Sequence, residues 1–128
     1  MIESRSVKRF RFGWYGDGGL GERMIQSILS GRKTATACPA YDPEDSDLKA
    51  GDELELVDKH GNVRGHLVVV NVEIRPFSSF DDALAAAEGI TLAELKDKLN
   101  FANGRQIRDS EEMRVVHFRT VSSGKVRL

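Results

Sequence analysis

Alternating apolar and polar residues predict a series of short β-strands along this chain. The alternation is clearest at residues 7–15, 35–39, 52–57, 63–74 and 113–121, and residues 125–128 are expected to add an edge. Such runs, rich in Val, Ile, Phe and Thr, are typical of half-buried strands. The turn at 58–62 joins the third and fourth segments, and Pro76 ends the fourth because proline cannot donate to a strand ladder.

Apolar residues spaced three and four apart predict three helices between these strands. The first spans Leu20–Ser30, and one face of it carries Leu20, Met24, Ile25, Ile28 and Leu29. A second, short helix is expected at Asp81–Glu88. The third begins with a capping box, in which the side chains of Thr91 and Glu94 each accept from the other's backbone N–H, and it runs to about Leu99.

The order of these elements is strand, helix, several strands, two helices and strand. Regular β-α-β alternation, which builds a doubly wound parallel sheet, is missing. We therefore expect an α+β fold, in which a small mixed or antiparallel β-barrel has helices packed at its ends. The 128 residues contain no internal repeat or convincing linker, so residues 1–128 are expected to form one domain.

The composition, 40% hydrophobic and 30% charged, is typical of a soluble globular protein. The longest apolar run, Leu67–Val70, is far too short to span a bilayer. No charged stretch followed by an apolar one opens the chain, and Cys38 is the only cysteine, so we expect a reducing, cytoplasmic location. The histidines, His60, His66 and His117, lack metal-ligand spacing, and we expect neither a metal nor an organic cofactor.

The formal net charge of −1 conceals a segregation of charge along the chain. Residues 1–40 carry seven Lys and Arg against three Asp and Glu, residues 41–100 six against fourteen, and residues 101–128 six against three. A protein that coats long duplexes is usually basic overall, so a small anionic or single-stranded ligand fits this balance better. Solvated charge without a partner is an equally good account. The acidic residues 41–50 are expected to form an exposed, mobile loop.

Residues Gly16–Gly21 match the dinucleotide-binding pattern G-x-G-x-x-G and lie between a strand and a helix. The preceding strand carries Lys8, Arg9 and Arg11, which a buried parallel strand does not, and no second β-α-β unit follows. We therefore interpret the glycines as a flexible turn into the helix and not as part of a Rossmann fold. The N-terminus of that helix is still a place where an anion could bind.

The stretch Ser30–Ala37, S-G-R-K-T-A-T-A, places two cations and two hydroxyls where the first helix ends, with Gly31 as an expected left-handed cap. On one interpretation, Lys33 complements the negative helix end and the threonines are ordinary strand residues. On the other, Lys33 has a pKa lowered by burial and removes the proton of Thr36, whose hydroxyl becomes a nucleophile. That chemistry requires a turn or bulge between the two residues, because residues three apart in a strand point to opposite faces.

The run Gly31–Thr36, G-R-K-T-A-T, followed by a strand that Gly51 and Asp52 open, resembles the activating signal cointegrator homology (ASCH) family, whose signature is G-x-K-x-x-T. The resemblance extends from about residue 15 to residue 121. It implies a small β-barrel related to the PUA RNA-binding domain. It also implies a ligand that is a nucleoside or a single-stranded or structured RNA.

Within that family the chain is similar to the small N4-acetylcytidine amidohydrolases, which carry a glutamate just before a helix start of the form T-L-x-E-L-K. Here the glutamate is Glu88 and the helix start is Thr91–Lys96. The resemblance implies that Thr36 is the nucleophile, Lys33 the proton acceptor and Glu88 the proton donor. A position at the negative end of a helix is expected to favour the protonated Glu88 carboxyl, the form that can donate to a leaving amine.

Two features differ from that branch. Cys38 stands where the amidohydrolases have an arginine, and residues 39–49 make a longer loop. Residues 13–21 match a larger ASCH type instead, and ribonuclease activity is associated with some of those relatives. From the residues alone, Cys38 is a small residue of a half-buried strand and not a nucleophile, because no Cys–His pairing is visible.

Three functions follow from these observations. The first is hydrolysis of an N-acylated pyrimidine nucleoside of the N4-acetylcytidine type, the second is RNA cleavage, and the third is RNA binding without turnover. Aromatic rings stack on bases and cations contact phosphates, so substrate or RNA contacts are expected on the first strand and after the first helix. These residues are Arg9, Arg11, Trp14, Tyr15, Arg32 and Thr34.

Overall fold

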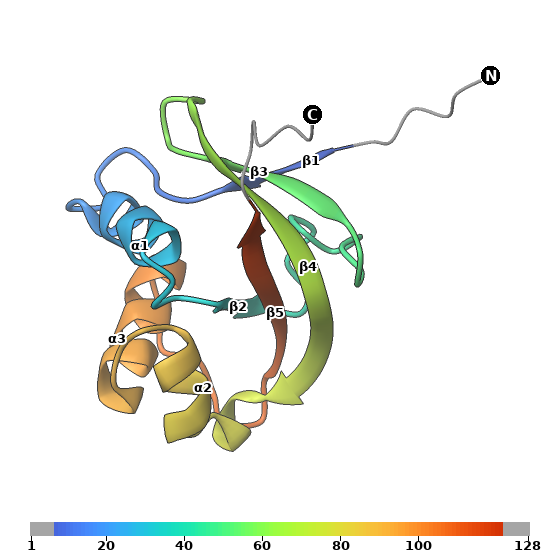
Figure 1. Ribbon diagram of the computed structural model, residues 1–128. Coiled ribbons are helices and arrows are strands. Elements are labelled where there is room, and N and C mark those ends of the chain that lie inside the picture. The colour runs from blue at the N-terminus through green and yellow to red at the C-terminus, as the bar shows by residue number, and fades with distance from the viewer. Residues whose placement is uncertain (1–6, 122–128) are drawn as a thin grey trace, which may run out of the picture.

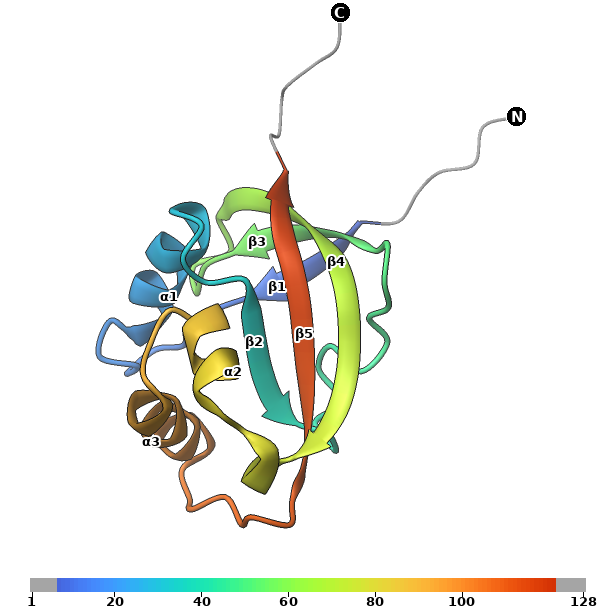
Figure 2. The same ribbon diagram turned by 60° about the horizontal axis from the view of Figure 1, so that its bottom comes forward.

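A five-stranded mixed sheet forms the centre of the computed structural model, which describes residues 7–121. Its strands, in chain order, are β1 (Lys8–Arg11), β2 (Ala35–Pro39), β3 (Glu53–Val57), β4 (Val63–Pro76) and β5 (Glu112–Val121). They lie side by side in the order β1-β3-β4-β5-β2; β1 is parallel to β3, and the other pairs are antiparallel. The long strands β4 and β5 bend, so the sheet curls into a half-barrel (Figures 1 and 2).

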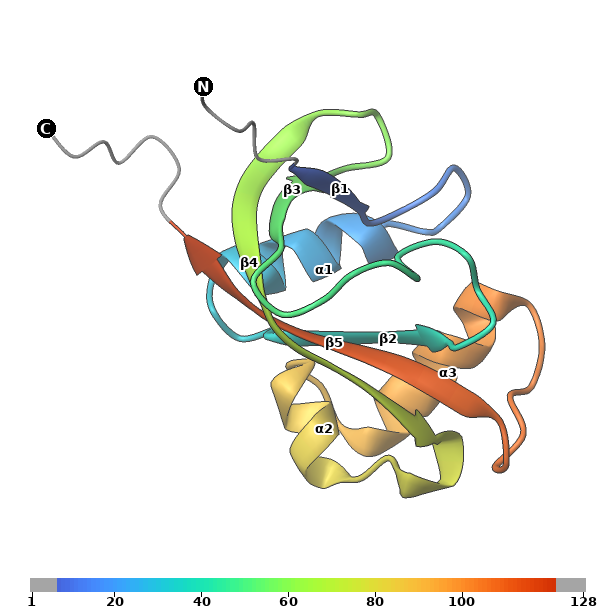
Figure 3. The same ribbon diagram turned by 90° about the vertical axis from the view of Figure 1, so that its right-hand side faces the viewer.

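The helices of the described residues lie to the left of the sheet in Figure 1, and Figure 3 shows that they lie on two sides of strands β2 and β5. Helix α1 (Leu20–Leu29) lies near the hairpin end of the sheet. Helices α2 (Asp82–Ala87) and α3 (Leu92–Asn103) follow a short 3-10 helix at Phe77–Ser79 and lie toward the other end of β4 and β5. The protein is therefore an α+β fold built on a barrel-like sheet, as the order of elements predicts.

The elements predicted within the described residues are present, but two of their ends differ from the prediction by more than two residues. The predicted strand at 7–15 contains only the short β1, because Gly13, at φ 100°, turns the chain out of the sheet toward α1. Helix α3 continues past its predicted end at Leu99 and stops where Gly104 takes a left-handed conformation. The capping box that opens α3 is present. The predicted edge at 125–128 lies outside the described residues.

Buried apolar side chains form two clusters, and β5 contributes to both. One joins α1 to the sheet: Phe10, Phe12, Ile25, Ile28, Leu48, Leu54, Leu56, Leu67, Val69, Val116 and Phe118. The other joins α2 and α3 to the sheet: Ala35, Phe77, Phe80, Leu84, Ala85, Leu95, Leu99, Ile107, Met113 and Val115. Neighbouring residues of a strand point to opposite faces, so Val115 and Val116 place the two clusters on opposite faces of β5.

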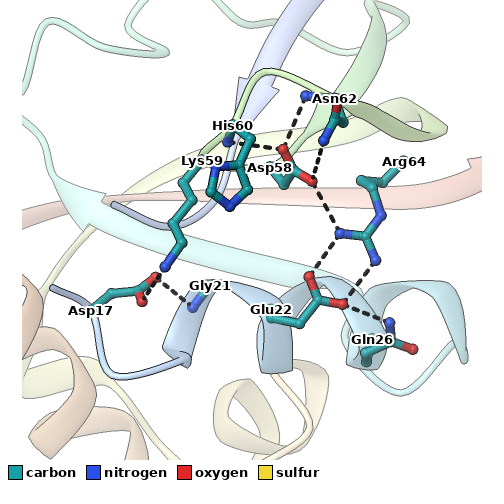
Figure 4. Close-up of polar contacts among 9 residues, drawn as sticks. All are labelled: Asp17, Gly21, Glu22, Gln26, Asp58, Lys59, His60, Asn62 and Arg64. Atoms are coloured by element: carbon teal, nitrogen blue, oxygen red, sulfur yellow. Dashed lines mark hydrogen bonds and ion pairs between the residues drawn. The ribbon is translucent and has the colours of Figure 1, made fainter. Parts of the chain in front are cut away.

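The loop before α1 closes around the buried carboxylate of Asp17 (Figure 4). Its donors are the backbone N–H groups of Trp14, Gly19 and Gly21, at 3.0–3.2 Å, and Lys59 Nζ at 3.3 Å. A side chain of the loop itself thus occupies the position at the N-terminus of α1 that an external anion would need. The glycine-rich segment is a turn, as predicted, and this helix end is not open to a phosphate.

The β3–β4 hairpin is tied to α1 through Arg64 (Figure 4). The guanidinium donates to both carboxylate oxygens of Glu22, at 2.7 and 2.8 Å, and to Asp58 Oδ2 at 3.2 Å. Asp58 also accepts from the backbone N–H groups of His60 and Asn62, which shapes the turn. These contacts hold the hairpin turn over the start of α1, next to the glycine-rich loop.

Replacing Gly21 by alanine is expected to destabilise the protein by about 1–3 kcal/mol, the usual cost of forcing atoms into a packed site. A Cβ atom at this position would collide with Gly13 Cα and lie 2.8 Å from Gly13 N, so two backbone segments would have to separate. Urea unfolding measures the loss. Gly65→Ala is the matched control, because its added methyl first meets the flexible end of Leu29. Equal free energies of unfolding for the two variants would contradict this packing.

Candidate active site

A cavity of about 340 Å³ lies between the loop after β1, helices α1 and α3, strand β2 and the segment that follows β2. The apolar part of its lining includes Phe10, Phe12, Trp14, Met24, Leu99 and Val116. The polar part is formed by Arg11, Thr36, Cys38, Asp42, Glu44, Asp45 and Lys98. A largely apolar and aromatic pocket of this size with a few polar groups is typical of sites for small organic ligands.

The acidic segment after β2 forms one wall of this cavity. Buried Arg114 of β5 donates to three of its backbone carbonyls, those of Ala40, Asp42 and Glu44, at 2.7–3.4 Å. Leu48 is buried in the apolar cluster around α1. Figure 3 shows the segment running back alongside β2 before it enters β3. The predicted exposure of the loop at 41–50 is confirmed for most of its residues, and its mobility stays a prediction, but the sequence did not predict that Leu48 is buried or that Arg114 binds the loop backbone.

Two side chains of the cavity have raised pKa values. Burial, together with the neighbouring carboxylates of Glu44 and Asp42, raises the pKa of Asp45 to about 7. Burial also raises the pKa of the Cys38 thiol to about 11, although Arg114 Nη1 lies 3.5 Å from its Sγ. At neutral pH Cys38 is therefore a thiol and not a nucleophile, in agreement with the sequence interpretation.

Beside the cavity, two lysines converge on one buried carboxylate. Lys33 Nζ and Lys98 Nζ each lie 2.7 Å from the same oxygen, Glu88 Oε1. Lys33 Nζ also donates to Ala35 O at 2.8 Å and lies 5.9 Å from the ring centre of Phe12, which lines the cavity. The other oxygen, Glu88 Oε2, is buried and has no hydrogen-bond partner among the described residues.

The charges of this cluster set the protonation of its members. Burial lowers the pKa of Lys33 to about 8; the Glu88 carboxylate opposes this shift and the Lys98 ammonium adds to it. For Glu88, burial favours the neutral acid, but Lys33 and Lys98 outweigh burial and hold the pKa below its usual range. The expectation of a protonated Glu88 is therefore wrong, because two ammonium groups in direct contact act more strongly than a helix dipole. Near neutral pH the carboxylate is ionised.

The connection between α1 and β2 presents Lys33 to this cluster. Gly31 takes φ 86°, as expected of a left-handed cap, and Thr34 N donates to Ala87 O at the end of α2. The Lys33 side chain reaches Glu88 from this connection. The turn lies before Lys33, at Gly31 and Arg32, whereas Thr34 O already accepts from Phe118 N of β5 and Ala35 begins β2. The turn or bulge that the sequence interpretation required between Lys33 and Thr36 is therefore absent.

Thr36 lies on β2 opposite Val116 of β5, and both residues line the cavity. Lys33 Nζ makes its hydrogen bonds with Ala35 O and Glu88 Oε1, and none joins it to the Thr36 hydroxyl. The structure thus brings Lys33 and Glu88 into contact and places Thr36 on the neighbouring cavity wall.

The residues predicted to contact substrate or RNA do not form one group. Arg11 and Trp14 line the cavity, and Trp14 also packs against Phe101 of α3 with ring centroids 5.9 Å apart. The remaining four are exposed and do not line it: Arg9, Tyr15, Arg32 and Thr34.

The sequence interpretation missed Lys98, Arg114 and the three acidic side chains of the cavity wall. Lys98 lies between the buried Leu95 and Leu99, so the period of α3 places it beside the buried face of the helix. Arg114 and the acidic wall come from segments far apart in the chain, and local patterns carry no information about their contact.

Within residues 7–121, no group of three or more His, Cys, Asp or Glu side chains is arranged to hold a metal ion. His117 instead contacts Glu73 of β4, with 2.7 Å between Nε2 and Oε2. In the same part of the chain, no helix has the length and apolar character needed to cross a bilayer.

No family model matches the sequence, and no curated protein is detectably similar to it. Solved structures, in contrast, share its architecture. An ASCH domain from Lactobacillus crispatus has a TM-score of 0.74 at 16% identity, over 91% of this chain and 80% of that one. A protein from Enterococcus faecalis, described under the family model DUF984, has a TM-score of 0.72 at 22% identity, over 94% and 79%. A mutant of the Zymomonas mobilis ASCH protein has a TM-score of 0.56 at 10% identity, over 91% and 74%.

This chain has the ASCH fold. At these identities the likeness concerns architecture, and it confirms the curled mixed sheet with helices that the sequence resemblance implies. In this ASCH fold, the run G-R-K-T-A-T leads from the end of α1 into β2. Its lysine, Lys33, joins the ion cluster, and its last threonine, Thr36, lines the cavity.

Lys33→Met is expected to remove a pH dependence of stability. In the folded protein Lys33 loses its proton near pH 8, and in the unfolded chain near pH 10.5. Between these values the unfolded state binds more protons, so the Lys33 contribution to the free energy of unfolding rises with pH, by up to about 3 kcal/mol. Urea unfolding of both proteins at pH values across this window measures the change. A difference between wild type and Lys33→Met that stays constant with pH would contradict the lowered pKa.

Proposed function

We propose that the cavity binds an N-acylated pyrimidine nucleoside of the N4-acetylcytidine type and that the protein hydrolyses the bond between the acyl group and the nitrogen. The observation that carries this proposal is the Lys33–Glu88–Lys98 cluster, which lies beside a cavity that also presents Thr36. A lysine whose pKa is lowered by burial can act as the base that activates a hydroxyl as a nucleophile. The comparisons support the fold, and the substrate is inferred from this site and the sequence resemblance.

In the proposed reaction the Thr36 hydroxyl attacks the acyl carbon, and neutral Lys33 accepts the hydroxyl proton. The carbon–nitrogen bond then breaks, the amino group of the nucleoside takes up a proton, and water hydrolyses the ester left on Thr36. The proposed reaction requires a water molecule to carry the first proton, because no direct hydrogen bond joins Thr36 to Lys33. Ionised Glu88 holds the two lysines and can donate a proton only after it has received one.

The charges of the cavity support a neutral ligand over an RNA strand. The carboxyl groups of Asp42, Glu44 and Asp45 line one wall. Those of Asp42 and Glu44 accept hydrogen bonds from amino and hydroxyl groups and repel phosphates, whereas Asp45, whose pKa is raised to about 7, is partly protonated near neutral pH. The rings of Phe12 and Trp14 offer surfaces on which a base can stack. RNA cleavage and RNA binding therefore receive less support from this cavity than hydrolysis of a nucleoside does.

Release of cytidine from N4-acetylcytidine, followed by chromatography, tests the proposal. Thr36→Ala is expected to abolish release because the nucleophile is lost. Lys33→Met is expected to reduce the rate by about 100-fold or more, the usual contribution of a general base. Thr34→Ala is the matched control, because this threonine, two residues away, bonds Ala87 O and does not line the cavity. It is expected to keep the wild-type rate.

Cytidine release by Thr36→Ala at the wild-type rate would contradict the role of Thr36. No release by the wild-type protein would contradict the proposed substrate. Labelled single-stranded RNA would then test the two RNA functions, with affinity measured at several salt concentrations. Binding through phosphates weakens steeply as salt rises, whereas binding of a neutral nucleoside does not.

A further inference from the structure

Lys98 is the member of the ion cluster that reaches the cavity. Its side chain is 12% exposed, whereas those of Lys33 and Glu88 are 1% and 0% exposed. Of these three residues, Lys98 contributes to the cavity lining. A ligand in the cavity can therefore contact the Lys98 ammonium directly, but it can reach Glu88 only by displacing an ion pair.

A single atom connects Lys98 to the proposed base. Glu88 Oε1 accepts a hydrogen bond from each of the two lysines, at 2.7 Å in both cases. A proton taken up by Lys33 can be returned to Lys98 across this shared oxygen, through two short charge-assisted hydrogen bonds. The carboxylate thus couples a base beside the cavity to an acid at its surface.

We propose that Lys98, and not Glu88, is the general acid that protonates the leaving amine. The assignment rests on the proposed amidohydrolase function and adds a catalytic residue to it. A general acid must lie within hydrogen-bond reach of the atom it protonates, which requires exposure to the ligand. Lys98 meets this requirement, and the buried Glu88 carboxylate, already held by two ammonium groups, does not.

Protons and electrons balance in this scheme. As the carbon–nitrogen bond breaks, its electron pair goes to the exocyclic nitrogen of the base, which takes a proton from Lys98 Nζ. Lys98 regains a proton from Lys33 through Glu88 Oε1, and Lys33 has taken that proton from the Thr36 hydroxyl. Water then attacks the ester, the Thr36 oxygen regains a proton from that water by way of Lys33, and the carboxylic acid leaves.

An amide and an activated ester differ in their need for such an acid. An amine leaves only after protonation, whereas 4-nitrophenolate is a stable anion that leaves without a proton. For N4-acetylcytidine and for 4-nitrophenyl acetate, the rate to compare is the rate of each protein minus the rate of Thr36→Ala. Comparison of the two substrates then distinguishes loss of the general acid from loss of the nucleophile. The comparison is made on the pH plateau of each variant, because loss of the Lys98 charge removes one cause of the lowered Lys33 pKa.

Lys98→Met is expected to slow hydrolysis of N4-acetylcytidine by about 100-fold or more and hydrolysis of the ester by less than about threefold, because only the amide needs a general acid. Lys98→Arg keeps a cation beside Glu88 but cannot give up its proton, so it is expected to be equally slow on the amide. Lys96→Met is the matched control on the same helix. Its side chain lies over Phe77 and does not line the cavity, and it is expected to behave as wild type on both substrates.

Equal losses on the amide and the ester in Lys98→Met would overturn the assignment, because Lys98 would then serve the nucleophile or ligand binding. Full amide activity of Lys98→Arg would also overturn it, since a fixed charge would suffice. Either result leaves the roles of Thr36 and Lys33 standing. A wild-type protein inactive on both substrates would overturn the proposed function and the Lys98 assignment together. Unfolding midpoints of all variants, compared with wild type, show whether a loss of activity reflects a loss of folding.

Discussion

One buried carboxylate oxygen, Glu88 Oε1, receives the ammonium groups of Lys33 and Lys98. These residues come from three segments: the α1–β2 connection, the end of α2 and the middle of α3. Taking charges out of water is costly, and the cost is offset only when the charges stay paired in good geometry. Electrostatics therefore constrains how these three segments pack, in addition to the burial of apolar side chains.

The same cluster relates the core to the cavity. Lys33 Nζ lies 5.9 Å from the ring centre of Phe12, in the apolar cluster around α1, and donates to Ala35 O, in the cluster under α2 and α3. Burial where the two clusters meet gives Lys33 a pKa near 8, and Lys98 extends the cluster to the cavity surface. Arg114 holds the acidic segment as the other wall. A ligand would therefore lie between a basic side and an acidic side, against aromatic rings.

Local patterns predicted most of the fold. The apolar stripe of α1, the bounds of β2 and the capping box at Thr91 depend on residues close in the chain, and all three are present. Predictions failed or were incomplete where distant residues decide the outcome. The charge of residues 41–50 predicted the exposure that most of them show, but not that Arg114 of β5 binds the backbone of that segment. The helix dipole at Glu88 favours a protonated acid, but two lysines from other segments make it a carboxylate.

By itself, the sequence determined the order of strands and helices, and it placed Lys33 and Thr36 after a helix cap with Glu88 at the end of another helix. Periodicity, caps and turns act over a few residues, so they can be read from the chain alone. The tertiary structure alone decided that Glu88 is ionised, that Lys98 reaches the cavity and that an acidic wall faces it. Charge states and access to a cavity depend on distances between residues remote in sequence, and only the packed fold sets those distances.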